Sequence, residues 1–310
     1  MKEMISAIIP LYNEAPNLHL LYKKLKSGLH KTNKPYEVIF VNDGSKDNSD
    51  SILKEIFEKD KENVVIINFR KNEGKAVALD TGIKYSKGDI IVTLDSDLQH
   101  DPEEIPLLIK RLDEGFDLVT GARKERRDAI GRIWFSKIVN LILFLLTGFK
   151  SKDFYCGFKA YRKEIVKELV PKKDIYRFIA YISYKRGYKV TETPITYHPR
   201  KFGKSKYGIK LFQRAFYDIL IIILVLRARH NPLYFFGSLS LITVLLGIII
   251  NPILIYNMKI STIPLLIINT FIFQSIILFS LTGTILDAIH QNQISEKKIG
   301  DYPIKNILKM

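Results

Sequence analysis

Five short apolar runs rich in β-branched residues recur along the first 120 residues, and four helix-like stretches separate them. The runs are residues 6–9, 38–41, 64–68, 90–94 and 118–120, and the stretches between them are 18–29, 51–59, 76–85 and 103–114. Such alternation is typical of a doubly wound α/β fold with a mainly parallel sheet. We therefore predict an α/β domain of this class, with its ligand site at the carboxyl ends of the strands.

Two aspartates follow the fourth apolar run directly. Asp95 and Asp97 stand one residue apart, and in an extended chain residues i and i+2 point the same way. The pair can therefore face one hard cation. The alternative is that both are turn or cap residues. We interpret the neighbouring Asp101 in that way, because Pro102 and Glu104 complete an N-cap, N1 and N3 set.

Two further strand ends carry polar residues. They are residues 10–14 after the first run and residues 42–45 after the second. Because the carboxyl ends of parallel strands meet at one edge of a sheet, these segments and the aspartate pair converge. A divalent ion held there can clamp a diphosphate. This favours a metal-dependent enzyme that acts on a nucleotide sugar.

Two long apolar stretches stand near the C-terminus. Residues 233–256 and 262–289 contain Asp287 as their only charged residue, and each exceeds the roughly 20 residues that a membrane-spanning helix needs. Lysines and arginines crowd before the first stretch and follow the second, whereas the connecting loop has only Lys259. We predict a multi-pass protein of the cell membrane with two spans, whose catalytic domain and both termini are cytoplasmic. No signal peptide is expected, because charges interrupt the first ten residues.

Composition argues against two other classes of protein. The net charge of +16 could suggest a nucleic-acid partner, but the basic residues gather beside the predicted spans and no nucleic-acid-binding motif is present. Anionic lipid is the expected counter-charge. Cys156 is the only cysteine, so an internal disulfide and a thiolate metal site are excluded.

Two amphipathic segments lie between the α/β region and the spans. Residues 133–149 are short for a span, and a crossing there would separate the aspartate pair from the later basic residues. We predict that this segment and residues 209–226 lie in the membrane interface. A core helix of the domain is the alternative for the first. The predicted organisation is a domain over 1–208, a juxtamembrane helix over 209–230, a two-helix membrane region over 231–290 and a cytoplasmic tail over 291–310.

Seven motifs carry a family resemblance. In chain order they are IIPLYNE, VNDGSKDNS, NEGKAVALDTG, LDSDLQHDP, GAR, DFYCGFKAYR and RKFGKSKYG. They resemble those of the inverting family-2 glycosyltransferases of GT-A fold. Within that family the chain looks most like the polyprenyl-phosphate hexose synthases, which include dolichyl-phosphate mannose synthase and bacterial polyisoprenyl-phosphate glucosyltransferases. The resemblance covers nearly the whole chain, and LDSDLQHDP and RKFGKSK are its most specific parts.

The resemblance implies two groups of donor-binding residues. Those that match positions holding the nucleotide sugar are Pro10, Tyr12, Glu14, Asp43, Lys75 and Asp95. Those that match the metal site are Asp95, Asp97 and Gln99. Mg²⁺ or Mn²⁺ suits such a set, because both ions prefer oxygen ligands. For Lys75 the alternative is a solvated lysine at a helix start.

The resemblance also implies residues for the acceptor and for catalysis. Those that match the lipid-phosphate site are Arg123, Arg132, Ser136, Arg200 and Lys206. A basic surface lying on anionic membrane would explain some of them equally well. Asp153, together with Arg123 and Arg200, matches the catalytic positions. Asp153 could act as a base, orient a sugar hydroxyl or cap the next turn.

The implied reaction is transfer of a hexose from UDP-glucose or GDP-mannose to polyprenyl or dolichyl phosphate, with inversion, at the cytoplasmic face of the membrane. A phosphate monoester with a second pKa near ~6 is already anionic at neutral pH, so it needs little help from a base. Positioning and charge neutralisation should dominate.

Other functions remain open from the sequence. One is a membrane glycosyltransferase with a glycolipid or polysaccharide acceptor, although the Gln-x-x-Arg-Trp motif of processive enzymes is absent. Another is a non-catalytic membrane protein that binds a nucleotide sugar. Homo-oligomerisation stays open, as do the sugar and the lipid.

Overall fold

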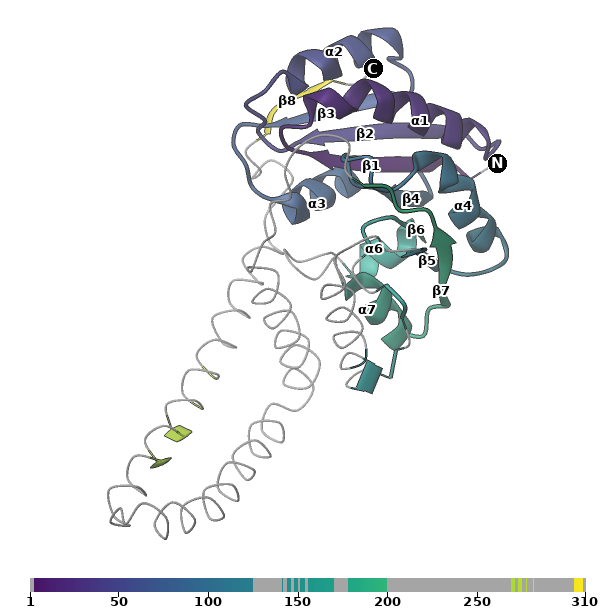
Figure 1. The fold of residues 1–310 in the computed structure, drawn as a ribbon, viewed down its shortest axis with the longest axis vertical. Helices are drawn as coiled ribbons and strands as arrows, with labels where there is room; N and C mark the ends of the chain where they lie inside the picture. Colours follow the sequence, from purple (N-terminus) through teal and green to yellow (C-terminus); the bar gives the residue numbers. More distant parts are fainter. Residues whose placement is uncertain are drawn as a thin grey trace. The chain divides into compact units, whose positions relative to one another are not determined.

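The structure, a computed structural model, describes most of the chain up to residue 199 and a short strand near the C-terminus (Figure 1). The described residues are 3–124, 141, 144–145, 148–149, 151–153, 156–169, 178–199, 269–270, 273–274, 277, 281 and 304–308. The chain divides into one unit made of Met1–Ser205 together with Lys297–Met310, and a second unit, Lys206–Glu296.

In the described part of the first unit, the strands form one sheet in the order β7-β5-β6-β4-β1-β2-β3-β8. The strands are β1 Ile5–Leu11, β2 Tyr36–Asn42, β3 Val64–Phe69, β4 Ile90–Thr93, β5 Leu118–Arg123, β6 Lys159–Arg162, β7 Val190–Ile195 and β8 Ile304–Leu308. β1 runs parallel to β2 and β4, β2 to β3, and β5 to β7, whereas β6 and β8 are antiparallel to their neighbours. The predicted α/β class with a mainly parallel sheet is confirmed. All five predicted strands are present, and β6, β7 and β8 were not predicted.

Helices cover both faces of this sheet. They are η1 Ala15–Asn17, α1 Leu18–His30, α2 Ser49–Lys59, α3 Lys75–Tyr85, η2 Pro102–Glu104, α4 Ile105–Asp113, α6 Lys163–Leu169 and α7 Ile179–Lys185. α1 packs against α2 and α4, and α3 packs on β1 and β2 (Figure 1). The four predicted helices therefore form, and the fourth begins with a 3₁₀ turn.

The central strands are buried on both faces, which explains their unbroken apolar sequences. Along β1, Ile5, Ala7 and Ile9 belong to the core that α1 shares. Ile8 points to the opposite face, where α3 approaches so closely that a Cβ on Gly82 would lie 2.4 Å from Ile8 Cγ2. Only a glycine allows this approach.

The strand register places the predicted polar segments at one edge of the sheet. Leu11 is opposite Asn42, and Asn42 is opposite Asn68. The Asn42 side chain joins β2 to β3, because its Nδ2 donates to Asn68 Oδ1 at 2.9 Å. The carboxyl ends of β1, β2 and β3 are thereby aligned, and β4 ends beside β1.

The described C-terminal strand returns to the far edge of the sheet. In β8, Leu308 is opposite Ile66 and Ile307 is opposite Ile67 of β3. Pairing covers a strand edge that would otherwise expose hydrogen-bonding groups. In Figure 1 β8 lies beside β3.

The predicted membrane segments lie mostly outside the described residues. Of the two predicted spans, 233–256 and 262–289, only helical residues at 269–270, 273–274, 277 and 281 are described. Residues 209–226 lie outside, and of 133–149 the helical residues 141, 144 and 145, together with 148 and 149, are described. Among the residues that the structure describes, no helix has the length and apolar character needed to span a bilayer.

Candidate functional site

The loops after β1 and β2 interlock at the carboxyl edge of the sheet. Asn13 N donates to Ser45 Oγ at 2.9 Å, and Asn13 Oδ1 accepts from Lys46 N at 2.7 Å. Asn13 has a φ of 57°, a left-handed conformation that asparagine tolerates better than most residues. The first two predicted polar segments therefore form one continuous structure.

The predicted nucleotide residues of the first loop lie together in this structure. Pro10 is buried at the end of β1, and Tyr12 and Glu14 are half-buried. Asn17 Nδ2 donates to Glu14 Oε2 at 2.6 Å, and Glu14 N donates to Ser49 Oγ at 3.2 Å. The Glu14 side chain is thus held in place before any ligand arrives.

Asp43 holds a third loop against the first two. Its Oδ1 accepts from Glu73 N at 2.7 Å and its Oδ2 accepts from Gly74 N at 3.0 Å. Burial raises the pKa of Asp43, and these two bonds oppose the rise. The next residue, Gly44, has a φ of +69°, and a Cβ there would lie 2.5 Å from the Lys71 carbonyl carbon. Asp43 therefore anchors the turn that begins α3.

Lys75, the first residue of α3, forms an ion pair with Asp95. Both side chains are about one-third exposed, at 36% and 33%. A Cβ on Gly157 would lie 3.0 Å from Asp95 Oδ2 and 3.2 Å from Lys75 Nζ, so the glycine leaves room for the pair. Burial would raise the pKa of Asp95, but the charges of Lys75, His100 and Lys159 hold it below its ordinary value. The structure places Lys75 against Asp95 rather than in solvent.

Of the two aspartates in the predicted metal set, Asp95 follows β4 closely and Asp97 lies on the turn after it. β4 ends at Thr93, so the extended conformation that we assumed does not continue to Asp97. Asp97 is 7% exposed, and its Oδ1 accepts from Gln99 N at 3.2 Å. Leu98 has a φ of 58°, which is rare for a bulky residue and typical of strain stored at functional sites. The turn sets the relative positions of the two carboxylates.

His100 is a buried residue beside Cys156 that sequence reasoning missed. Its ring is 5% exposed, and Nε2 lies 3.6 Å from Cys156 Sγ. Burial lowers the pKa of His100, while the charges of Asp95, Asp97 and Asp153 oppose that effect. His100 therefore belongs to the same electrostatic environment as these three carboxylates.

Tyr197 connects the predicted metal set to the predicted acceptor residues. Its hydroxyl accepts from Gln99 Nε2 at 2.7 Å. The guanidinium carbon of Arg123 lies 5.0 Å from the centre of the Tyr197 ring, a cation–π distance. No motif in the sequence pointed to Tyr197, because it comes 98 residues after Gln99 and meets it only through the fold.

Arg123, which is half-buried, forms a bidentate ion pair with the buried Asp153. Arg123 Nη2 donates to Asp153 Oδ1 at 2.8 Å, and Arg123 Nε donates to Asp153 Oδ2. Asp153 is 3% exposed. Burial opposes the charge on Arg123, but Asp153 more than compensates and holds the pKa of Arg123 above its ordinary value. The structure brings these two predicted residues together, whereas Arg132, Ser136, Arg200 and Lys206 lie outside the described residues.

The predicted metal set fits Mg²⁺ or Mn²⁺. Within the described ranges, no group of three or more His, Cys, Asp or Glu side chains surrounds one point. Asp95 and Asp97 supply two carboxylates, and Gln99 supplies an amide oxygen. Mg²⁺ usually binds through one or two carboxylates, with substrate phosphates and water completing its shell. The set therefore suits an ion that is bound together with a diphosphate.

Comparison with known sequences identifies related proteins. Residues 6–170 match the model of glycosyl transferase family 2. Undecaprenyl-phosphate 4-deoxy-4-formamido-L-arabinose transferase from Edwardsiella ictaluri is 33% identical over 236 residues, which are 76% of this chain and 72% of the relative. The protein of the same name from Photorhabdus laumondii is 35% identical over 216 residues, which are 70% of this chain and 66% of the relative. The match thus spans about two thirds to three quarters of these relatives.

Solved structures show the same fold. Glucosyl-3-phosphoglycerate synthase from Mycobacterium tuberculosis, in complex with Mn²⁺, UDP and phosphoglyceric acid, superposes with a TM-score of 0.55. The superposition covers 72% of this chain and 78% of that one, at 17% sequence identity. At this identity the similarity shows the fold alone.

Proposed function

The chain belongs to glycosyl transferase family 2 and is a glycosyltransferase, and from this premise we propose that it transfers a sugar from a nucleoside diphosphate sugar to a polyprenyl phosphate, with inversion. One observation carries the proposal. In the oxygen-donor set of Asp95, Asp97 and Gln99, Gln99 donates to Tyr197, and the Tyr197 ring lies beside the half-buried Arg123. The diphosphate of the donor and the phosphate of the acceptor are both anionic, so each needs positive charge nearby. The oxygen-donor set can hold a cation for the first, and Arg123 supplies a charge for the second.

On the donor side, the interlocked loops at 10–14 and 42–49 form the expected nucleoside site. Asp95, Asp97 and Gln99 would hold Mg²⁺ or Mn²⁺, and such an ion, when bound, neutralises charge on the leaving diphosphate. The use of a divalent ion is supported by the Mycobacterium tuberculosis neighbours of the same fold, which were solved with Mn²⁺ or Mg²⁺ and UDP. Lys75 brings a second positive charge to the same place, since it already contacts Asp95.

On the acceptor side, Arg123 orients the lipid phosphate. A phosphate monoester with a second pKa near ~6 is mostly ionised at neutral pH, so no base has to remove a proton before attack. Both Asp153 oxygens accept hydrogen bonds from Arg123. Asp153 therefore acts by holding the arginine, and Arg132, Ser136, Arg200 and Lys206 complete the phosphate site.

The identity of the sugar is decided by the pocket loops rather than by the fold. UDP-glucose and GDP-mannose are the donors expected from the sequence. The relatives are named for 4-deoxy-4-formamido-L-arabinose and for undecaprenyl phosphate. A nucleotide-linked form of that sugar therefore joins the donors to be tested, and undecaprenyl phosphate is the first acceptor to test, followed by dolichyl phosphate.

Transfer of labelled sugar from each of the three donors to undecaprenyl phosphate, in detergent with Mn²⁺ or with a chelator, tests the proposal. We expect a lipid-linked product from one donor and a loss of at least about 100-fold with chelator, because the ion supplies several kcal/mol to the leaving group. Donor binding without lipid product, for every donor and for both lipids, would contradict the proposal. That result would favour a different acceptor or the non-catalytic binding protein.

The proposal places the enzyme in the cell membrane with two spans, at 233–256 and 262–289, and with both termini in the cytoplasm. The pairing of β8 with β3 supports one part of this proposal, namely that both termini lie on the same side, because the tail belongs to the same unit as the N-terminal domain. Two spans satisfy this condition, because an even number of crossings returns the chain to the side on which it began.

Labelling of added cysteines tests this topology. We expect an impermeant thiol reagent to label Met310→Cys only after the cells are opened, and to label Lys259→Cys, in the predicted connecting loop, in intact cells. Cys156 stays in place, since it is 1% exposed. Labelling of Met310→Cys in intact cells would contradict the predicted orientation.

A further inference from the structure

We propose that Glu192 is a positioning residue for the reaction, which fastens the segment 151–153 so that the Asp153 carboxylate meets Arg123. This inference rests on the proposed function, because it assigns a purpose to the Arg123–Asp153 pair. The Glu192 carboxylate binds three consecutive residues of the segment. It has no place among the predicted site residues.

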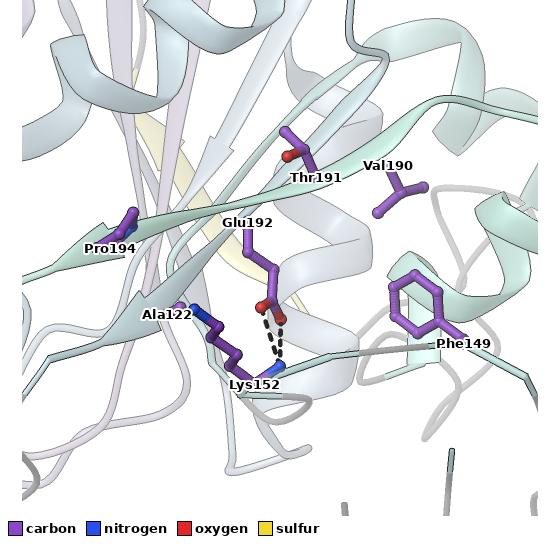
Figure 2. A pocket seen from close by; sticks show the side chains of 7 residues that line it. All are labelled: Ala122, Phe149, Lys152, Val190, Thr191, Glu192 and Pro194. Atoms are coloured by element: carbon purple, nitrogen blue, oxygen red, sulfur yellow. Dashed lines mark hydrogen bonds between the residues drawn. The ribbon is translucent and has the colours of Figure 1, made fainter. Parts of the chain in front are cut away.

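Glu192 lies on β7, and its side chain makes every contact that holds the segment. Its carboxylate accepts from Ser151 Oγ at 2.5 Å, from Lys152 N at 2.9 and 3.0 Å, and from Asp153 N at 3.4 Å. Figure 2 shows Glu192 pointing to the Lys152 backbone across the space beside β5. A carboxylate has about four lone-pair sites, so one side chain can accept all of these bonds.

The pairing of β7 with β5 places the residue that holds the segment close to Arg123 in the fold. β7 runs parallel to β5, with Glu192 opposite Thr120 and Ile195 opposite Arg123. The strand that supplies Glu192 is therefore the neighbour of the strand that supplies Arg123. Glu192 ties the segment carrying Asp153 to the same pair of strands, and Arg123 N, 3.4 Å from Asp153 Oδ2, adds a further contact.

On the side that faces Glu192, the segment 151–153 borders a cavity and is not closely packed. A cavity of about 280 Å³ lies there, lined by Ala122, Phe149, Lys152, Val190, Thr191, Glu192 and Pro194 (Figure 2). Beside such a space, a loop backbone depends on its hydrogen bonds for its position. Glu192 provides those bonds for Lys152 and Asp153.

Glu192→Gln is the variant that tests the proposal. Glutamine has nearly the same size, but its amide group has only one acceptor oxygen. Its NH₂ group would face a backbone N–H of the segment, and two donors cannot form a hydrogen bond. We expect kcat for sugar transfer to fall about 10- to 100-fold, because a small misplacement of a positioning group is costly. The KM for the nucleotide sugar should stay unchanged. In the Arg123→Lys background, Glu192→Gln should cause little further loss, since both changes act on one interaction.

Hydrogen exchange of the segment gives a readout that does not need activity. In Glu192→Gln we expect the amides of Lys152 and Asp153 to exchange about tenfold faster. Asp117→Asn is the matched control, because Asp117 Oδ2 accepts from Lys189 N at 2.8 Å at the opposite end of the same two strands. That variant should keep both the exchange of 151–153 and the transfer rate.

Each outcome decides a separate question. Unchanged exchange in Glu192→Gln would overturn the attachment, and faster exchange with an unchanged transfer rate would overturn the positioning role. Full additivity with Arg123→Lys would also overturn it. A wild-type chain that transfers no sugar would overturn the proposed function, and the exchange rates would still show whether Glu192 holds the segment.

Discussion

Asp97→Asn is expected to lower sugar transfer by at least about 1,000-fold while the protein still folds. A bound metal ion stabilises the leaving diphosphate by several kcal/mol, and each ~1.4 kcal/mol is a factor of ten in rate. Asparagine removes one of the two carboxylates of the oxygen-donor set. It keeps an oxygen that can accept from Gln99 N, which is the contact that Asp97 makes in the turn.

The measurement combines transfer rate, donor binding by calorimetry with and without Mn²⁺, and thermal unfolding. Asp101→Asn is the matched control from the same segment. The Asp101 side chain accepts from Glu103 N at 3.1 Å as an N-cap, and asparagine caps helices equally well. We expect this control to keep its activity. An Asp97→Asn variant with wild-type activity would remove the metal-site assignment.

Arg123→Lys and Asp153→Asn are each expected to lower transfer about 100-fold, and the double variant is expected to be no worse than either. Lysine keeps the charge but loses the planar fork that binds a carboxylate or a phosphate through two bonds. Asparagine removes the carboxylate that pairs with Arg123 among the described residues. Residues that act as one unit show losses that do not add.

Lysine is preferred to alanine at Arg123, because removing one partner of a buried ion pair costs about 3–5 kcal/mol of stability. Arg162→Lys is the control: Arg162 Nη1 donates to Glu3 Oε1 at 2.6 Å in a more exposed pair on β6. Its transfer rate should stay within about twofold of wild type. Losses that add in the Arg123 and Asp153 double variant would show that Asp153 acts independently, for example as a base.

Much of the first half of the fold could be predicted from the sequence, because its signals are local. Strands buried on both faces have unbroken apolar sequences, and helices show their own period and caps. Asp101 caps the helical segment as predicted. Glu104 occupies the predicted N3 position, and its side chain also accepts from Thr196 N at 2.8 Å, 92 residues away, which was not predicted.

The candidate site was predictable only in part. The sequence placed Asp95, Asp97 and Gln99 together, since they are neighbours in the chain. The resemblance assigned Asp43 to the nucleoside and Lys75 to a phosphate, which stay predictions, and the structure adds the contacts of Asp43 with the 73–74 backbone and of Lys75 with Asp95. These partners are 20 to 31 residues apart in the chain, so no local sequence pattern predicts their contacts.

By itself, the sequence determined the α/β class, the order of the first five strands along the chain, and the polar segments that end three of them. Tertiary structure alone decided that β6 enters between β4 and β5, that β8 closes the edge of β3, and that Tyr197 and Glu192 support the site. The physical reason is that helix and strand formation depends on nearby residues. The partner of a side chain across the sheet depends on how the whole chain packs.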